Sequence, residues 1–218
     1  MMHQASVGYR DRADAGSTLA AELMKYAGQN VAVFGVGAGG VAVAAPIAKA
    51  LGADLDVLAV RRLALPGQPE HVWGAVAVLG DCVQIAMEPD TDRNGPAAPE
   101  LCDAVRQRDL TQLRHLEDTY RAGRPPERVN GRLVIVVGDG LSSLAVIRAA
   151  ASAVRRHHPA SLVIALPTAT TQMCRQLDRV ADEVIYGVCG GLLSHADASV
   201  YCDHVSIDIE DVKRLLSA

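Results

Sequence analysis

Short apolar runs alternate with stretches of helical periodicity through the second half of the chain. The pattern predicts strands at 133–137, 161–166 and 183–186, with helices at 144–157 and 171–180 between them. Strands that alternate with helices in this way are typical of βαβ units and a parallel sheet. The second half is therefore predicted to be doubly wound α/β.

The beginning of the chain carries the same pattern. It predicts a helix at 15–26, a strand at 30–35, an alanine-rich helix at 41–51 and a strand at 55–63. The last three form one more βαβ unit, with parallel strands and a right-handed crossover. Its first strand and its helix are joined by the segment GVGAGG at 35–40, which predicts a tight glycine-rich turn.

Between these two parts the pattern changes. Two β-rich runs at 72–79 and 82–87 are separated by a Gly-Asp pair and predict an antiparallel hairpin at a sheet edge. The polar, proline-rich segment at about 88–100 is predicted to be an exposed, mobile loop, and a charged helix follows at 99–121. The glycine-rich segment at about 187–206 is predicted to form a small irregular hood before a short closing helix.

Composition narrows the class of protein. A chain of 218 residues, 50% of them hydrophobic, can bury one core, so residues 1–218 are predicted to form a single domain. The net charge of −4 argues against nucleic-acid binding, and no apolar run of about 20 residues predicts a membrane span. The 5 cysteines are widely spaced without a C-x-x-C pair, so neither a disulfide framework nor a zinc site is predicted. We expect a cytoplasmic protein.

The segment LVIVVGDGLSSLAVIRAA at 133–150 is the most informative for function. Its β-rich run stops at Gly138-Asp139-Gly140, and a helical pattern starts at Leu144. In an open α/β sheet such a junction lies at the carboxyl edge, where a loop and a helix N-terminus present unpaired N–H groups to anionic ligands. The ligand site is therefore predicted there.

The glycines of the first βαβ unit allow a second interpretation. Gly35, Gly37 and Gly40 fit the G-x-G-x-x-G pattern of dinucleotide-binding proteins. That pattern needs an acidic residue at the end of the second strand, whereas this chain has Arg61-Arg62 there, which could serve a 2′-phosphate. An NADP-binding oxidoreductase therefore stays open as a hypothesis, beside the simpler one that these glycines only permit a tight turn.

The two glycine-containing loops together resemble those of type I phosphoribosyltransferases. The family signature is a hydrophobic strand, two acidic residues, glycine, two variable positions and a Thr-Gly-x-Thr loop that opens a helix; this chain has VVGDGLSSLAV. Further segments, YRDRADAGSTLA, YRAGRPP and VIALPTAT among them, extend the resemblance from about Tyr9 to Leu216. The resemblance implies a doubly wound parallel sheet with an antiparallel edge hairpin and a small irregular C-terminal hood.

The resemblance also implies a reaction, the transfer of a phosphoribosyl group from phosphoribosyl pyrophosphate (PRPP) with Mg²⁺ to an acceptor. In that interpretation Asp139 orients the ribose hydroxyls and Arg62 neutralises charge on the departing pyrophosphate, as catalytic residues. Loop backbone and hydroxyl groups hold the phosphates. The residues implied in that binding are Gly39, Gly40, Gly140, Leu141, Ser142, Ser143 and Leu144.

The chain departs from the family pattern at four positions in these loops. Gly138 replaces the first acid, Leu144 the loop glycine, Val146 the second threonine, and Ala38 an arginine of close relatives. A charged hydrogen bond contributes about 1.5–3 kcal/mol, so the losses at Gly138 and Ala38 could weaken ligand or transition-state binding about 10² to 10⁴-fold. An active transferase with an altered loop and a non-catalytic phosphosugar- or nucleotide-binding or structural partner domain are both left open.

The acceptor is not identified by the sequence. Aromatic residues make up 3% of the chain, and Tyr186 and Tyr201 are the candidates for stacking a base, with core or hood packing as the alternative. We expect a small phosphorylated ligand as the partner, and neither nucleic acid nor membrane. Because relatives commonly dimerise, the resemblance also implies a homodimer.

Overall fold

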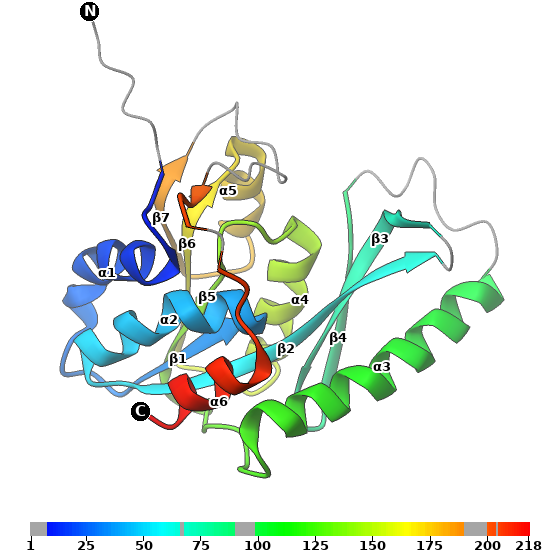
Figure 1. Cartoon of the computed structure of the whole chain (residues 1–218), viewed down its shortest axis with the longest axis horizontal. Helices are drawn as coiled ribbons and strands as arrows, with labels where there is room; N and C mark the ends of the chain where they lie inside the picture. Colours follow the sequence, from blue (N-terminus) through cyan, green and yellow to red (C-terminus); the bar gives the residue numbers. More distant parts are fainter. Residues whose placement is uncertain (1–7, 66–67, 90–98, 190–199, 204) are drawn as a thin grey trace, which may run out of the picture.

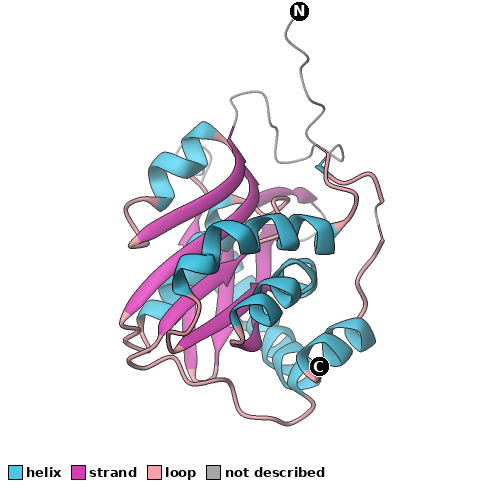
Figure 2. Ribbon diagram, turned by 90° about the vertical axis from the view of Figure 1, so that its left-hand side faces the viewer, coloured by secondary structure: helices cyan, strands magenta, loops and turns pink. Residues whose placement is uncertain are grey.

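The computed structural model describes residues 8–65, 68–89, 99–189, 200–203 and 205–218. They form one mixed sheet in the order β4-β3-β2-β1-β5-β6-β7 with helices on both faces (Figures 1 and 2), which confirms the predicted α/β class. The strands are β1 (Val31–Val36), β2 (Asp54–Leu65), β3 (Gln68–Leu79), β4 (Cys82–Met87), β5 (Leu133–Val137), β6 (Ser161–Ala169) and β7 (Glu183–Cys189); the helices are α1 (Arg12–Leu23), the 3-10 turn η1 (Met24–Tyr26), α2 (Gly37–Leu51), α3 (Pro99–Arg121), α4 (Leu144–Arg155), α5 (Thr171–Leu177) and α6 (Ile209–Leu216).

The order of the parallel strands creates a switch point in the middle of the sheet. Strands β2, β1, β5, β6 and β7 are parallel, and β3 and β4 form the predicted antiparallel edge. From β1 the chain passes through α2 to β2 on one side, and it later returns to pair β5 with the other side of β1. Ligands of open α/β folds bind at the carboxyl ends of the two strands that flank such a point.

Two apolar layers explain why the central strands are apolar at almost every position. Ala32, Phe34 and Val36 of β1 face the layer that includes α4 and α5, and Val31 and Val33 face α1 and α2. Helices α1, α2 and α6 lie in front of the sheet in Figure 1, and α4 and α5 lie behind it. A strand buried on both faces loses the apolar-polar alternation of a half-exposed strand.

A buried charged cluster fixes α3 on the sheet. The Arg121 guanidinium donates to Asp56 at 2.9 and 3.2 Å, to the Val57 carbonyl at 2.7 Å and to Glu117. Asp56 also accepts from the Glu127 N–H at 2.8 Å. Each of the three charged residues is at most 5% exposed, so the pairing is needed to offset their loss of water.

Helix α2 starts earlier than predicted, and the glycine-rich turn is the first turn of this helix. The helix begins at Gly37, not at residue 41. A Cβ on Gly40 would lie 2.6 Å from the Val137 carbonyl oxygen, which is closer than real Cβ atoms come. Glycine at this position therefore lets the helix begin directly against the end of β5, without a separate loop.

Strand β6 continues past Pro167, although the sequence pattern predicts an end before this proline. Val137, the last residue of β5, pairs with Ala165, so the part of β6 beyond Ala165 pairs, among the described strands, with β7 alone. The missing N–H of Pro167 therefore costs no hydrogen bond on the β5 side. The strand runs on to Ala169, and β7 runs on to Cys189.

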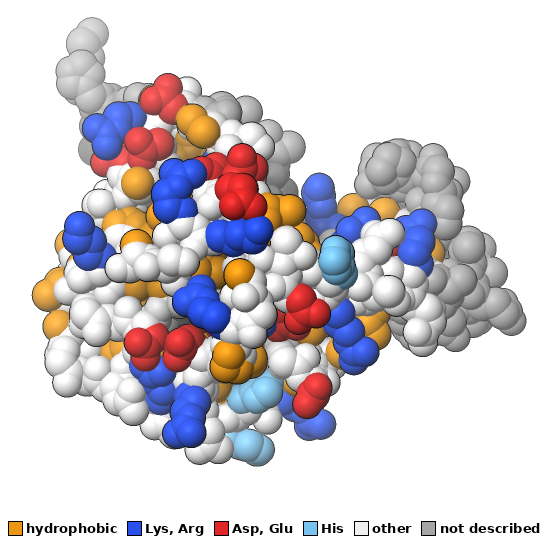
Figure 3. Space-filling view, turned by 60° about the horizontal axis from the view of Figure 1, so that its bottom comes forward, with side chains coloured by type: hydrophobic (Ala, Val, Ile, Leu, Met, Phe, Trp, Pro, Cys, Tyr) orange, Lys and Arg blue, Asp and Glu red, His pale blue; other side chains and the backbone are white. Residues whose placement is uncertain are grey.

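Two predicted features lie largely outside the described residues. The mobile loop predicted at about 88–100 falls mostly on residues 90–98, and half of the predicted hood falls on residues 190–199. The described part of the hood consists of the end of β7 and a segment around Tyr201, which forms a bridge to Tyr9. On the face shown in Figure 3, basic side chains lie among acidic ones.

Candidate ligand site at the β1–β5 switch point

The ends of β1 and β5 bring the two glycine-containing turns together. Gly35 of β1 pairs with Val137 of β5, so both strands end at the same edge of the sheet. A Cβ on Gly39 would lie 2.4 Å from Asp139 Oδ2, so the bare Cα of Gly39 contacts the Asp139 carboxylate. The structure thus places Gly39, Gly40 and Asp139 together at this edge, at the switch point.

Asp139 is held by its own loop. Its Oδ1 accepts hydrogen bonds from the Leu141 N–H at 3.1 Å and from the Ser142 hydroxyl at 3.2 Å. Its Oδ2 lies 3.7 Å from an Arg12 guanidinium nitrogen, with 15% of the Asp139 side chain exposed. The carboxylate is therefore positioned before any ligand arrives, and one of its oxygens faces a cation.

Tyr201 fixes the backbone of the same residue. Its hydroxyl donates to the Asp139 carbonyl oxygen at 2.6 Å, and its ring lies 5.1 Å from the Arg12 guanidinium carbon. Burial, and next the negative charge of Asp139, raise the pKa of Tyr201. The phenol therefore keeps its proton and remains a donor. With the residue 2% exposed, Tyr201 serves as a wall of the site, and its hydroxyl is occupied.

The segment before α1 and the segment around Tyr201 pack beside this wall. The Tyr9 N–H donates to the Val200 carbonyl and the Cys202 N–H to the Tyr9 carbonyl, both at 2.9 Å. Arg12 reaches the same C-terminal segment by donating to the Val205 carbonyl at 2.9 Å. The described residues before α1 and residues 200–203 thus form one layer next to Asp139.

The rest of the β5–α4 loop has mixed roles. Gly140 has φ +76°, and a Cβ there would lie 2.7 Å from Thr168 Oγ1, so both the conformation and the space require glycine. Ser143 is the N-cap of α4 and accepts from the Val146 N–H at 3.4 Å. Leu144 is 3% exposed and its side chain packs in the core, so its backbone alone can belong to a ligand site.

Two of the departures from the family pattern have a packing explanation. A Cβ on Gly138 would lie 2.7 Å from Leu166 Cδ2 and 2.9 Å from Ile147 Cδ1, so a carboxylate there would point into the apolar layer. Ala38 packs against an apolar cluster that includes Val41. A side chain at position 138 would thus point into the apolar core, and the side chain at position 38 packs against it.

Arg62 is not joined to this loop. It is exposed on β2, four residues beyond Leu58, which pairs with the end of β1. Within the described residues no hydrogen bond or ion pair connects Arg62 to Asp139. Its neighbour Arg61 forms an ion pair with the buried Asp109 of α3 at 3.3 Å, which occupies one of the two arginines considered for a 2′-phosphate.

Arg12 is the site residue that the sequence interpretation missed. Helix α1 was predicted from residue 15, but Asp11 caps it by accepting from the Asp14 N–H at 2.8 Å, so Arg12 lies in the first turn. A Cβ on Gly16 would lie 2.2 Å from the Val43 carbonyl oxygen, so α1 and α2 touch there. One turn earlier on each helix, this contact places Arg12 beside Gly39. The sequence signal for this contact was Gly16, one helical turn after Arg12, because a glycine inside a helix permits close packing.

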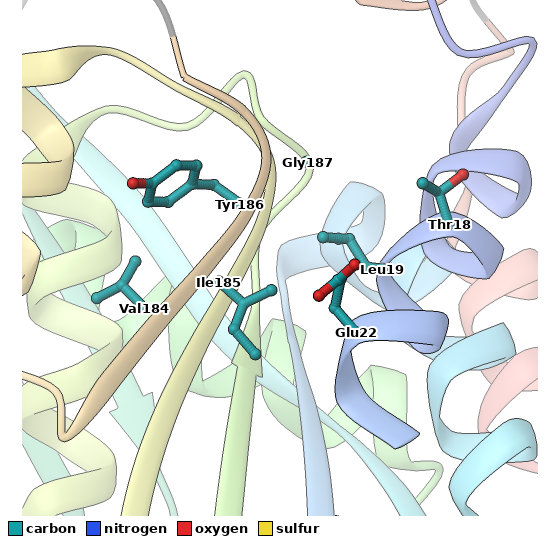
Figure 4. Close-up of a pocket in the computed structure, with 7 residues that line it drawn as sticks. All are labelled: Thr18, Leu19, Glu22, Val184, Ile185, Tyr186 and Gly187. Carbon is teal, nitrogen blue, oxygen red and sulfur yellow. The ribbon is translucent and has the colours of Figure 1, made fainter. Parts of the chain in front are cut away.

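Tyr186, the other predicted stacking residue, lies at a separate open pocket. The pocket has a volume of about 320 Å³ and lies between α1 and the outer strand β7, lined by Leu19, Glu22 and Ile185 among others. Figure 4 shows Ile185 directed toward α1 and Tyr186 directed to the opposite side of β7. Tyr186 is 41% exposed, and its ring does not line the site at Asp139 as the Tyr201 ring does.

Comparisons with known proteins extend this description. "Putative phosphoribosyl transferase Rv0571c" of Mycobacterium tuberculosis H37Rv is 36% identical over 177 residues, which are 81% of this chain and 39% of that protein. The strain CDC 1551 protein, "Putative phosphoribosyl transferase MT0597", matches equally. The crystal structure of TT1426 from Thermus thermophilus has 33% sequence identity and a TM-score of 0.75, covering 96% of this chain and 97% of that one. No model of a known protein family matches.

The fold and the site define an α/β protein with paired glycine turns and one carboxylate at a switch point. This architecture, together with the similarity to these relatives, shows that the chain belongs to the type I phosphoribosyltransferase-like family. It spans about two fifths of the length of the curated relatives that it matches. Among the helices in the described ranges, none is long and apolar enough to cross a membrane.

Proposed function

We propose that this protein binds PRPP, or a closely related phosphorylated ribose, at the β1–β5 switch point. The contact between the bare Cα of Gly39 and the Asp139 carboxylate is the observation that carries the proposal. It places one fixed carboxylate between two turns that open helices α2 and α4. Helix N-termini favour anions, and a carboxylate between them suits the hydroxyls of a sugar.

The residues divide between the two parts of such a ligand. Asp139 orients the ribose hydroxyls through its carboxylate oxygens. The N–H groups around Gly39 and Gly40 hold the pyrophosphate, and the loop of Gly140, Leu141, Ser142, Ser143 and Leu144 holds the 5′-phosphate. Ser143 can cap α4 and bind the phosphate at the same time, because a hydroxyl that accepts a hydrogen bond from the helix still has a proton to donate.

Mg²⁺ fits this site only together with the ligand. In the described part of the chain no three His, Cys, Asp or Glu side chains gather to hold a metal ion. Mg²⁺ is commonly bound by one or two carboxylates and by substrate phosphates, so Asp139 is the side chain that would hold it. A bound Mg²⁺ would offset negative charge on the pyrophosphate.

We propose phosphoribosyl transfer to a small acceptor as the activity, at a rate reduced by the altered loops. Asp139 binds the ribose, and Arg62, which is exposed on the long strand β2, reaches the departing pyrophosphate only after a side-chain rearrangement. The protein would act in the cytoplasm, a compartment that suits the free thiols of Cys82 and Cys202, and as a homodimer.

Calorimetric titration with PRPP and Mg²⁺ tests the proposal. The wild-type protein should bind with a dissociation constant below about 1 mM, and Asp139→Asn should weaken binding about 10-fold or more, because it removes a charged hydrogen-bond acceptor. Asp54→Asn is the matched control, since Asp54 pairs with Arg132 at the start of β2, far from the carboxyl edge. Absence of binding by the wild type, or equal binding by Asp139→Asn, would contradict the proposal. Binding without pyrophosphate release, with a range of acceptors, would assign the non-catalytic alternative.

A further inference from the structure

The guanidinium of Arg12 lies between the two turns of the site. One of its nitrogens is 3.7 Å from Asp139 Oδ2, and another donates to the Val205 carbonyl at 2.9 Å. The Tyr201 ring lies beside it, with the ring centre 5.1 Å from the guanidinium carbon. The side chain is 16% exposed. Arg12 is therefore a largely buried cation, held in place on three sides.

The third nitrogen, Nε, has no acceptor among the described residues. It is buried, and no hydrogen bond from it to any of them exists. It lies 3.2 Å from the position that a Cβ on Gly39 would occupy. A buried N–H without an acceptor is unfavourable and uncommon in folded proteins. The donor therefore lies against the turn that the proposed function assigns to pyrophosphate.

The contact with Asp139 does not explain the position of Arg12 by itself. At 3.7 Å it is a long ion pair, without the two parallel hydrogen bonds that arginine and carboxylate form in their strongest geometry. An Asp139 carboxylate engaged with ribose hydroxyls would also leave the cation available for another anion. A guanidinium with several donors in a plane matches phosphate oxygens well.

We propose that Arg12 binds the pyrophosphate group of PRPP at the Gly39-Gly40 turn. This inference rests on the proposed function. Arg12 thus provides, from α1, the positive charge that Ala38 lacks, since the Ala38 side chain packs in an apolar cluster. In the absence of ligand the same guanidinium neutralises Asp139, so ligand binding exchanges a carboxylate partner for a phosphate partner.

Three ligands separate this role from a structural one. PRPP and inorganic pyrophosphate carry the group that Arg12 would bind, whereas ribose 5-phosphate lacks it. With Mg²⁺ present, Arg12→Gln should weaken binding of PRPP and pyrophosphate about 10- to 100-fold, as expected for lost charged hydrogen bonds. Binding of ribose 5-phosphate should change less than about twofold on the same scale. Arg12→Lys should keep part of the affinity, because it keeps the charge.

Arg10→Gln is the matched control, because the Arg10 side chain is 72% exposed and pairs with Asp11, not with Asp139. Equal loss of affinity for all three ligands in Arg12→Gln would overturn the inference and assign Arg12 a purely structural role. The same conclusion would follow if Arg12→Gln were unfolded while Arg12→Lys bound the ligands like the wild type. Unchanged PRPP binding by Arg12→Gln would overturn the inference while the proposed function stands. Pyrophosphate binding that depends on Arg12, in a protein that does not bind PRPP, would contradict the proposed function and the assignment of Arg12 to PRPP, and would make Arg12 part of a site for free pyrophosphate. A wild type that binds neither would overturn both.

Discussion

Gly39 and Asp139 are in contact across the junction of two neighbouring strands, although 100 residues separate them in the sequence. The carboxylate oxygen occupies the space in which any other residue at position 39 would place its Cβ, 2.4 Å away. Each residue therefore constrains the other: glycine gives the carboxylate its place, and the carboxylate excludes larger side chains.

Gly39→Ala should displace the Asp139 carboxylate and weaken PRPP binding about 10-fold or more, since the ribose contact and the pyrophosphate turn both change. Calorimetry measures this effect. Gly74→Ala is a matched control because its Cβ would lie 2.6 Å from the Ala86 carbonyl oxygen, in the β3–β4 hairpin. The control should lose stability but keep its affinity. If Gly39→Ala binds PRPP like the wild type, the contact is irrelevant to the ligand.

Ser143→Ala should lower both stability and affinity. Loss of the cap of α4 costs about 1 kcal/mol, measured by urea unfolding. Loss of the hydroxyl donor should weaken PRPP and ribose 5-phosphate about 3- to 10-fold and to the same extent, because both ligands carry the 5′-phosphate. A loss of stability with no change in affinity would show that Ser143 only caps the helix.

The fold was largely predictable because burial on both faces makes each central strand a continuous apolar run. The start of α2 was not, because glycines that predict a turn in isolation here allow a helix to begin against the Val137 carbonyl. The length of β6 was not either, because the effect of Pro167 depends on which neighbour its missing N–H would have faced. Such effects arise between segments that are distant in sequence.

The candidate site was predictable only in part, because it too depends on contacts between segments that are distant in sequence. A strand followed by Gly-Asp-Gly locates Asp139 at the carboxyl edge from sequence alone. Arg12 reaches that edge through the contact between Gly16 and the α2 backbone; Gly16 signals a close approach, but the sequence does not say which helix approaches. The involvement of Tyr201 with the Asp139 carbonyl likewise depends on a C-terminal segment that packs beside Tyr9.

Tyr201→Phe should destabilise the protein by about 1–3 kcal/mol, because the Asp139 carbonyl loses its buried donor. Tyr9→Phe is the comparison, since the Tyr9 hydroxyl donates to the Pro167 carbonyl at the longer distance of 3.2 Å and is half-buried. Urea unfolding should show a smaller loss for Tyr9→Phe. Equal losses would mean that the bond to Asp139 has no special weight.

Alkaline pH should destabilise the fold through Tyr201, which is buried, and Tyr26, which is partly buried. The pKa of Tyr201 is raised by burial and then by Asp139, and burial, with Glu183 next, raises the pKa of Tyr26 to about 12. Because the folded phenols keep protons that the unfolded chain loses near pH 10, their contribution is complete below about pH 10 and declines as the pH rises further. Urea unfolding at a series of alkaline pH values should show this decline, with a shallower slope for Tyr201→Phe. An identical slope in this variant would contradict the assignment.

Arg121→Met should destabilise the protein by about 3–5 kcal/mol, because it leaves the buried carboxylates of Asp56 and Glu117 without their cation. Arg114→Met, an exposed substitution on the same helix, should have an effect within about 0.5 kcal/mol. Thermal or urea unfolding distinguishes the two. A small effect of Arg121→Met would mean that water or a rearranged partner reaches the cluster.

The proposed function requires that the turns after β1 and β5 form one ligand site. Backbone amide NMR during titration with PRPP and Mg²⁺ can show this residue by residue. The largest shift changes should fall together on Gly39, Gly40, Gly140 and Leu141, with one shared dissociation constant. Changes confined to one of the two turns, or located elsewhere such as the pocket between α1 and β7, would contradict the proposed function.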